Sequence, residues 1–101
     1  MVVTEQDIRD ALRGVIDPEL GINIVDLGLV YGVEIDDDGV RVLMTMTTPA
    51  CPLGSYLRDL AMSAIASRVP GAHDVEVSLV WEPPWHPGMM SAEARLQLGA
   101  R

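Results

Sequence analysis

Hydrophobic side chains recur at helical spacing in two stretches of the chain. The first runs from Thr4 to about Gly14, and its apolar stripe is Ile8, Ala11, Leu12, Val15 and Ile16. Thr4 is suited to cap this helix, and Asp17-Pro18 should end it, because the residue before a proline avoids helical geometry. The second helix should end near Val69-Pro70-Gly71, and its stripe is Leu53, Leu57, Leu60, Ala61, Ala64 and Ile65.

Three segments alternate between apolar and polar residues, as strands do. Residues 29–35 and 40–46 flank the turn Asp36-Asp37-Asp38-Gly39, which predicts a hairpin with glycine at a position of positive φ. Residues 74–81 follow the second helix and should pair in parallel with 40–46 through a right-handed crossover. One face of the first strand should carry Leu29, Tyr31, Val33 and Ile35, and one face of the second Val40, Val42, Met44 and Met46. In the third strand the expected inward positions are Val75, Val77, Leu79 and Trp81.

Two segments carry too much proline, glycine or asparagine for regular structure. Residues 17–28 should form an irregular loop packed over the core, and residues 81–90 should run extended over the surface as a flap. Ser91 should cap a short last helix over 92–98. The order α-β-β-α-β-α predicts an α+β fold, a two-layer α/β sandwich with a small three-stranded mixed sheet. We expect a single domain over 1–101, in which 82–101 form the flap and the C-terminal helix.

Composition narrows the class of protein. The chain has 101 residues, the size of one small domain, and its hydrophobic content of 49% is enough for a core. Its net charge of -8 argues against a nucleic-acid or anionic-membrane partner, and no apolar run approaches the ~18–20 residues of a membrane span. A chain this short buries roughly 60–65% of its unfolded surface, so a homodimer interface would help it.

The chain's single cysteine lies in the stretch Thr47-Thr48-Pro49-Ala50-Cys51-Pro52-Leu53-Gly54, which joins a strand pattern to a helix pattern. Pro52 fits the first position of the helix, which would place Cys51 at or beside the N-cap. The backbone N–H groups and helix dipole there favour a thiolate, the form that binds metals and reacts. The alternative is that Cys51 is a small buried hydrophobe. One cysteine precludes an internal disulfide and suits a reducing cytoplasm.

Ligand count limits any metal centre built from one chain. An iron–sulfur cluster usually takes four ligands, mostly thiolates, and this chain offers only Cys51. A cluster could lie between two chains, with Cys51 from each and the remaining positions filled by Asp26, Glu19 or an outside thiol. Such incomplete ligation would be labile, which suits transfer rather than storage. The alternative for Asp17, Glu19 and Asp26 is capping of backbone N–H groups in turns.

The histidines do not favour a cysteine-based enzyme. A Cys-His hydrolase needs a histidine held against the nucleophile. His73 and His86 both lie apart from Cys51 in the sequence, and His73 follows a Pro-Gly turn. We therefore expect no enzymatic activity, and a redox sensor or a cysteine enzyme is the least favoured of the functions considered.

Several motifs together resemble one known family. The chain is similar to the iron–sulfur cluster assembly family that includes SufT-like and PaaD-like proteins and the eukaryotic cytosolic iron–sulfur targeting subunit, and it looks like the stand-alone SufT type. The resemblance covers roughly Glu5 to Leu98. The motifs that carry it are Asp17-Pro18-Glu19, Ile24-Val25-Asp26-Leu27-Gly28-Leu29-Val30-Tyr31, Thr47 to Pro52, and Trp81-Glu82-Pro83-Pro84-Trp85.

The resemblance implies a role in iron–sulfur cluster assembly or client maturation, as a carrier or an adaptor. The family's loop cysteine falls on Cys51, its acidic motif residues fall on Asp17, Glu19 and Asp26, and Thr48 precedes the cysteine. Cys51 would hold iron or a cluster transiently, with Glu19 and Asp26 as further ligands and Asp17, Thr48 and Pro52 supporting them. In the adaptor alternative, the flap docks a scaffold or client protein through Trp81, Trp85 and Met89.

Overall fold

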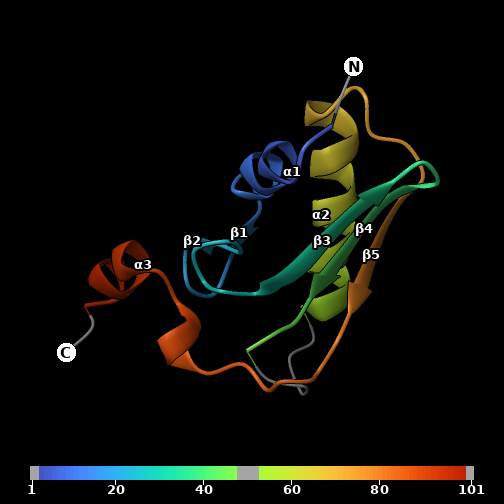
Figure 1. Ribbon diagram of the computed structural model, residues 1–101. Helices are drawn as coiled ribbons and strands as arrows, with labels where there is room; N and C mark the ends of the chain where they lie inside the picture. The colour runs from blue at the N-terminus through green and yellow to red at the C-terminus, as the bar shows by residue number, and fades with distance from the viewer. Residues whose placement is uncertain (1–2, 48–52, 100–101) are drawn as a thin grey trace.

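The computed structural model describes residues 3–47 and 53–99 (Figure 1). The predictions about Thr48, Cys51 and Pro52 therefore concern residues outside the described ranges. The helices are α1 (Glu5–Leu12), α2 (Gly54–Arg68) and α3 (Ala92–Gln97), with a short 3₁₀ helix η1 (Pro87–Met89) before α3. The strands are β1 (Ile16–Asp17), β2 (Ile22–Asn23), β3 (Val30–Asp36), β4 (Gly39–Met44) and β5 (Val75–Leu79).

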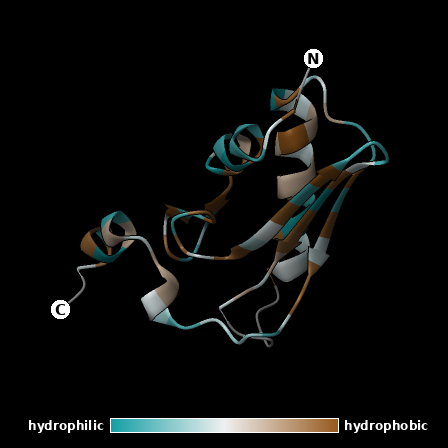
Figure 2. Ribbon diagram, in the orientation of Figure 1, coloured by the Kyte–Doolittle hydropathy of each residue, from teal (hydrophilic) through white to brown (hydrophobic). Residues whose placement is uncertain are grey.

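The main sheet has the predicted topology. Its strand order is β3-β4-β5, with β3 and β4 antiparallel and β4 and β5 parallel. Helix α1 packs against β3, α2 packs against β5, and the two helices contact each other. They therefore cover one face of a mixed three-stranded sheet, which confirms the α+β sandwich. Figure 2 shows hydrophobic segments along the strands and a hydrophilic turn between β3 and β4.

The first helix is capped as predicted but ends early. Thr4 accepts a hydrogen bond from the Asp7 backbone N–H, and Asp7 accepts one from the Thr4 N–H, which forms a capping box. The helix stops at Leu12, so Val15 is buried beyond it and Ile16 lies on β1, where it is 45% exposed. Our placement of Ile16 on the helical stripe was wrong, because the chain has already turned into a strand.

The segment expected to be irregular contains a small hairpin. β1 and β2 pair antiparallel, with Asp17 opposite Ile22. The expected packing over the core is confirmed, because Ile22, Ile24 and Leu27 are all buried. The prediction of no regular structure was wrong, since strands of two residues are too short to give an alternating pattern in the sequence.

A β-bulge in β3 changes which side chains face the core. The register shifts between Val30 and Gly32, so Val30 lies opposite the buried Met44 and Val33 lies opposite the buried Val42. An inserted residue breaks the period of two, which puts Val30 rather than Tyr31 in the inward series. Trp81 was also expected to point inward, but it lies beyond the end of β5 and is 40% exposed.

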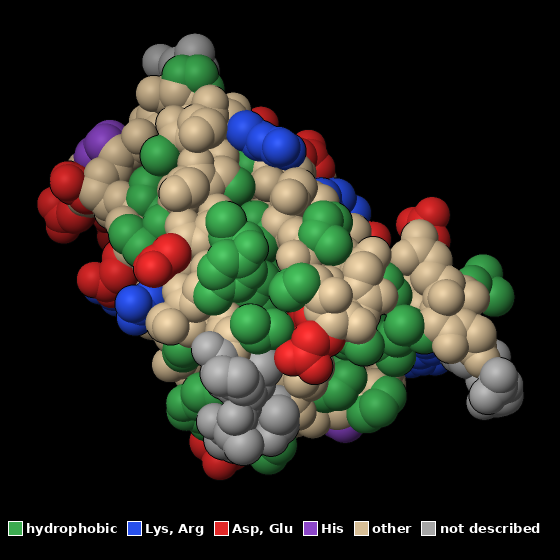
Figure 3. Space-filling view, turned by 180° about the vertical axis from the view of Figure 1, so that it is seen from behind, with side chains coloured by type: hydrophobic (Ala, Val, Ile, Leu, Met, Phe, Trp, Pro, Cys, Tyr) green, Lys and Arg blue, Asp and Glu red, His purple; other side chains and the backbone are tan. Residues whose placement is uncertain are grey.

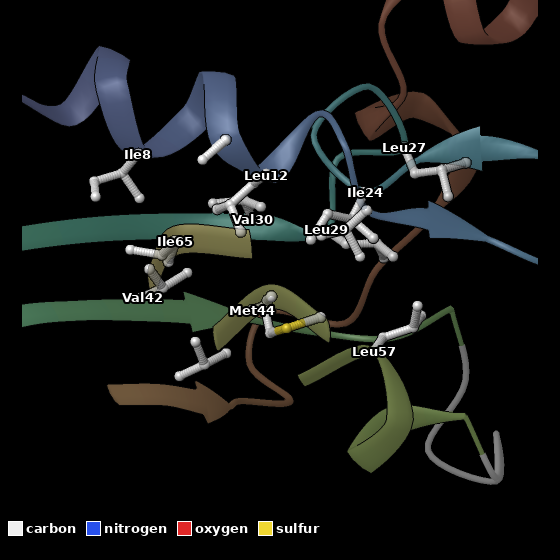
Figure 4. Packing of buried hydrophobic residues seen from close by; sticks show 14 of the residues in the cluster. Ile8, Leu12, Ile24, Leu27, Leu29, Val30, Val42, Met44, Leu57 and Ile65 are labelled. Atoms are coloured by element: carbon white, nitrogen blue, oxygen red, sulfur yellow. The ribbon is translucent and has the colours of Figure 1, made fainter. Parts of the chain in front are cut away.

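A single apolar cluster fills the space between the helices, the sheet and the 17–28 segment. Figure 4 shows the labelled side chains of this cluster packed together. Its fully buried members include Ile8, Leu12, Ile24, Leu27, Leu29, Val42, Met44, Leu57 and Ile65. The flap (residues 81–90) runs past the sheet and carries the chain to α3, which Ser91 caps as predicted (Figure 1). Its residues Pro87–Met89 form η1, so the prediction of a wholly extended flap was wrong. Along the described ranges, no helix combines the length and apolar character needed to cross a bilayer.

Candidate functional site

Three segments far apart in the sequence meet around one pocket of about 290 Å³. Asp17, Glu19 and Leu20 come from the turn between β1 and β2, and Thr47 is the last described residue before the cysteine loop. The other lining residues come from the flap and the C-terminal segment, namely Trp85, Pro87, Met90 and Leu98. We call this space the loop pocket. It brings part of the predicted acidic motif and part of the predicted flap to the entrance of the cysteine loop.

Asp17 shapes the acidic turn rather than exposing its charge. Its side chain is 3% exposed, and Oδ1 accepts hydrogen bonds from the backbone N–H groups of Glu19 at 2.8 Å and Leu20 at 3.3 Å. Carboxylates in turns satisfy backbone donors in this way. The capping alternative is therefore confirmed for Asp17, whose bonds hold Glu19 and Leu20 in place. Glu19 itself is exposed at the pocket.

The structure does not bring Asp26 into the loop pocket. Its carboxylate accepts a hydrogen bond from Asn23 Nδ2 at 2.8 Å and lies 3.6 Å from the Arg13 guanidinium. Its backbone carbonyl accepts a hydrogen bond from the Ser91 N–H at 2.8 Å, which joins the 17–28 segment to the start of α3. Asp26 therefore tethers the C-terminal helix through its backbone, and its side chain is already paired.

Helix α2 begins later than expected. Its N-cap is Leu53, which makes no side-chain capping hydrogen bond, and its first residue is Gly54. The predictions that Pro52 opens the helix and that Cys51 lies at its N-cap fall on residues outside the described ranges. The helix starts close to the sheet here, since a Cβ at Gly54 would meet Leu79 at 3.3 Å. Over residues 3–47 and 53–99, no three His, Cys, Asp or Glu side chains gather closely enough to hold a metal ion.

The flap is fixed to the fold by its aromatic and methionine residues. Trp85 is half-buried against the core, and its Nε1–H donates to the Leu27 carbonyl at 2.8 Å. The Tyr31 hydroxyl donates to the Pro83 carbonyl at 2.7 Å and lies 3.5 Å from the Met89 sulfur. Burial raises the pKa of Tyr31, Thr45 opposes this shift and Glu82 adds to it, so the phenol stays protonated and remains a donor.

Sequence reasoning missed several residues that build this region. Leu20, Met90 and Leu98 line the loop pocket, and their signal in the sequence is only that they are apolar residues beside turns and at a helix end. Gly28 was named only as part of a motif and given no role, although its φ of +79° and its close approach to the Met89 backbone require glycine. His86 is exposed, with Nδ1 accepting from the Gly88 N–H at the start of η1.

Comparison with known proteins identifies the family. The family described as "Iron-sulfur cluster assembly protein" matches residues 5–79. The chain belongs to this family of iron–sulfur cluster assembly proteins. The family resemblance stated from the sequence motifs is thus confirmed.

Relatives and a solved structure extend the match. The chain is 51% identical over 86 residues to the "Fe-S protein maturation auxiliary factor SufT" of Staphylococcus aureus, covering 84% of this chain and 97% of that protein. It is 39% identical over 67 residues to an "Iron-sulfur cluster carrier protein" of Deinococcus radiodurans, covering 66% of this chain and 19% of that protein. A crystal structure of a domain of unknown function, DUF59, from Bacillus anthracis superposes with a TM-score of 0.91 at 40% identity, covering 96% of this chain and 92% of that one.

The family match and the structural match differ in whether they include the flap. The family match ends at residue 79, before the flap begins, whereas the Bacillus anthracis structure covers 96% of this chain. A superposition of that extent takes in the flap and α3. The loop pocket is therefore built from both the family-matched part of the chain and the C-terminal part shared with this neighbour.

Replacing Asp17 tests its assigned part in the pocket. Asp17→Ala should lower the free energy of unfolding by about 0.5–2 kcal/mol, because two part-buried backbone donors lose their acceptor. Urea unfolding followed by circular dichroism measures this loss. Glu19→Ala is the matched control, since Glu19 is exposed and its loss should change stability by less than about 0.5 kcal/mol. Equal losses in the two variants would contradict the capping assignment.

Proposed function

We propose that this chain is a factor in iron–sulfur cluster assembly that holds iron or a cluster transiently through Cys51 and passes it to a client protein. The iron or cluster is cargo in this account. The observation that carries the proposal is the loop pocket, which places Glu19, Thr47 and the flap residue Trp85 together where the chain enters the cysteine loop. Membership of the assembly family and the printed names of the two relatives support the same role.

The chemistry of Cys51 suits brief holding. A thiolate is the usual protein ligand of iron in clusters, and one chain supplies a single thiolate. The acidic turn offers Glu19 as an exposed carboxylate ligand, while the Asp26 carboxylate is already paired with Asn23 and Arg13. The remaining ligands would come from the donor, the client or a small thiol, and the cargo would leave with them. Thr48 and Pro52 would shape the loop that presents Cys51.

An adaptor function is the second candidate, and the apolar character of the surface favours it. Leu20, Met90 and Leu98 line the loop pocket beside Trp85, and Trp81 is 40% exposed on the flap. On the face seen in Figure 3, hydrophobic side chains gather in the middle of the surface, with charged side chains around them. Such surfaces dock other proteins. In this version Trp81, Trp85 and Met89 mark the docking side, and no cluster is held stably.

The relatives are auxiliary or carrier factors by name, which supports a non-catalytic role for this chain. The positions of the histidines agree with that proposal. His86 serves as the N-cap of η1, and His73 is exposed beside Asp74 with its Nδ1 3.3 Å from the carboxylate. We propose that the whole of 1–101 works as one unit, because Ser91 and Trp85 bind the C-terminal part to the 17–28 segment.

The test is activation of a chemically demetallated [4Fe–4S] dehydratase by a cluster-loaded scaffold protein, with and without this chain. The carrier proposal predicts that wild type accelerates activation and that Cys51→Ser does not. The adaptor version predicts that Cys51→Ser still accelerates activation, while Trp81→Ala, which changes only an exposed side chain, does so less well. Equal activation rates with and without the wild-type chain would contradict both versions.

A further inference from the structure

The two edges of the main sheet differ in how they are protected. Along the described ranges, no strand pairs with the outer edge of β5 or of β3 (Figure 1). β3 carries a bulge at Val30/Gly32, a device that discourages edge-to-edge pairing. β5 is regular along its whole length, contains no proline and has Glu76 as its only charged residue. β5 therefore has the edge that is open to another strand.

The direction of the β5 backbone groups follows from one hydrogen bond. The Val80 N–H donates to the Met44 carbonyl on β4 at 2.8 Å. Successive residues of a strand point their N–H and C=O groups to opposite sides, so those of Ser78 and Glu76 also face β4. The N–H and C=O groups of Val75, Val77 and Leu79 consequently face outward, where a neighbouring strand could bond to them.

We propose that β5 pairs antiparallel with β5 of a second copy of this chain, in a register centred on Val77. This register makes the strand complementary to itself. Val77 lies opposite Val77 of the other copy, and Val75 lies opposite Leu79, so each outward residue exchanges both backbone hydrogen bonds with its counterpart. Glu76, whose carboxylate lies 3.2 Å from Arg41 of its own chain, is opposite Ser78 of the other copy on the outer face, and this keeps the two Glu76 side chains apart. A partner of unrelated sequence would satisfy the backbone groups but not these side-chain pairs.

This arrangement joins two sheets into one of six strands and has a consequence for the cysteine loops. The start of α2 lies against Leu79, at the end of β5. Antiparallel pairing puts Leu79 of one copy beside Val75 of the other, so the two α2 N-termini lie at opposite ends of the interface. A second copy bound through β5 therefore leaves each cysteine loop to bind its own cargo. The proposal goes beyond the assembly function and does not depend on it.

Lysine and glutamate at position 78 should change the dissociation constant of the dimer in opposite directions, which tests the register. Ser78 is on the outer face of β5, and lysine there would oppose Glu76 of the other copy twice per dimer. Ser78→Lys should tighten the dimer roughly 2- to 30-fold, because cross-strand charge pairs stabilise sheets, and Ser78→Glu should weaken it by a similar factor. Analytical ultracentrifugation over a range of concentrations up to about 500 µM, suited to a small interface, measures the dissociation constant.

Matched controls separate register from net charge. Gln97 is exposed on α3, away from the sheet, so Gln97→Lys and Gln97→Glu change the charge of the chain by the same amounts. They should leave the dissociation constant within about twofold, since exposed charges distant from an interface are screened. A wild-type monomer at every concentration would overturn the proposal. The proposal would also be overturned if the Ser78 variants changed the dissociation constant by no more than the Gln97 variants do.

Amide hydrogen exchange gives a second readout that does not depend on a substitution. The outward amides of Val75, Val77 and Leu79 should exchange more slowly as protein concentration rises across the dimer transition, because pairing protects them. The inward amides of Glu76 and Ser78 should be protected at all concentrations. A dimer in which the outward amides keep their monomer exchange rates would place the interface elsewhere and overturn the proposal.

Discussion

Gly28→Ala should lower the free energy of unfolding by about 2–5 kcal/mol and release the flap from the 17–28 segment. Gly28 has a φ of +79°, a conformation that costs an L-residue roughly 1–2 kcal/mol. A methyl group at this position would overlap the Met89 carbonyl oxygen and lie 2.8 Å from its carbon, which adds about 1–3 kcal/mol of overpacking. Urea unfolding measures the loss, and the fluorescence of Trp81 and Trp85 reports the flap.

Gly21→Ala is the control that isolates the contact with Met89. Gly21 has a similar φ of +70°, but a methyl group there meets no described heavy atom within 4 Å. It should therefore cost only the conformational part, about 1–2 kcal/mol, and leave the flap in place. If the two variants lose equal stability with unchanged tryptophan fluorescence, the close approach of Gly28 to the flap does not hold the flap down.

Trp85→Ala should cost about 2–4 kcal/mol of unfolding free energy. Truncating a buried aromatic residue typically costs 3–5 kcal/mol, and Trp85 is half-buried, which places the loss somewhat lower. The substitution also leaves the Leu27 carbonyl without its donor at 2.8 Å. Thermal unfolding measures this loss directly. Since Trp85 packs on the core, we expect its removal to affect fold stability as well as any partner affinity.

Trp85→Phe separates the hydrogen bond of Trp85 from the packing of its ring, and Trp81→Ala serves as a comparison. Trp85→Phe keeps an aromatic ring and removes only the indole N–H, so it should lose about 0.5–1.5 kcal/mol, the net value of one hydrogen bond. Trp81→Ala changes the tryptophan that is 40% exposed and should alter stability by less than about 0.5 kcal/mol. If Trp81→Ala is the more destabilising tryptophan variant, our assignment of Trp85 as the anchor of the flap is wrong.

Regular elements were predictable where the pattern repeats over several turns or pairs. The Thr4 cap, the Asp36–Gly39 turn and the parallel pairing of β5 all agree with the sequence, because each depends on local geometry or on a strong topological preference. The β3 bulge was not predictable. It inserts one residue into an alternating run, and Val30 and Tyr31 are both acceptable on either face.

The candidate site was predictable as a set of motifs but not as an arrangement. Asp17, Glu19 and Trp85 do meet around one pocket beside Thr47, as segments sharing a function should. Asp26 belongs to the same motif set, but the structure pairs its carboxylate with Asn23 and Arg13 instead. Arg13 caps the end of α1, so this pairing depends on how α1 packs beside the 17–28 segment, which the sequence pattern does not specify.

The proposed function requires that Cys51 hold iron or a cluster in passing. Anaerobic reconstitution with ferrous iron and sulfide tests it most directly, with wild type and Cys51→Ser treated side by side and read by visible absorbance and by iron bound per chain. Wild type should show thiolate-to-iron absorbance and bound iron, and Cys51→Ser should lose both. Equal iron binding and absorbance in the two proteins, or none in either, would contradict it.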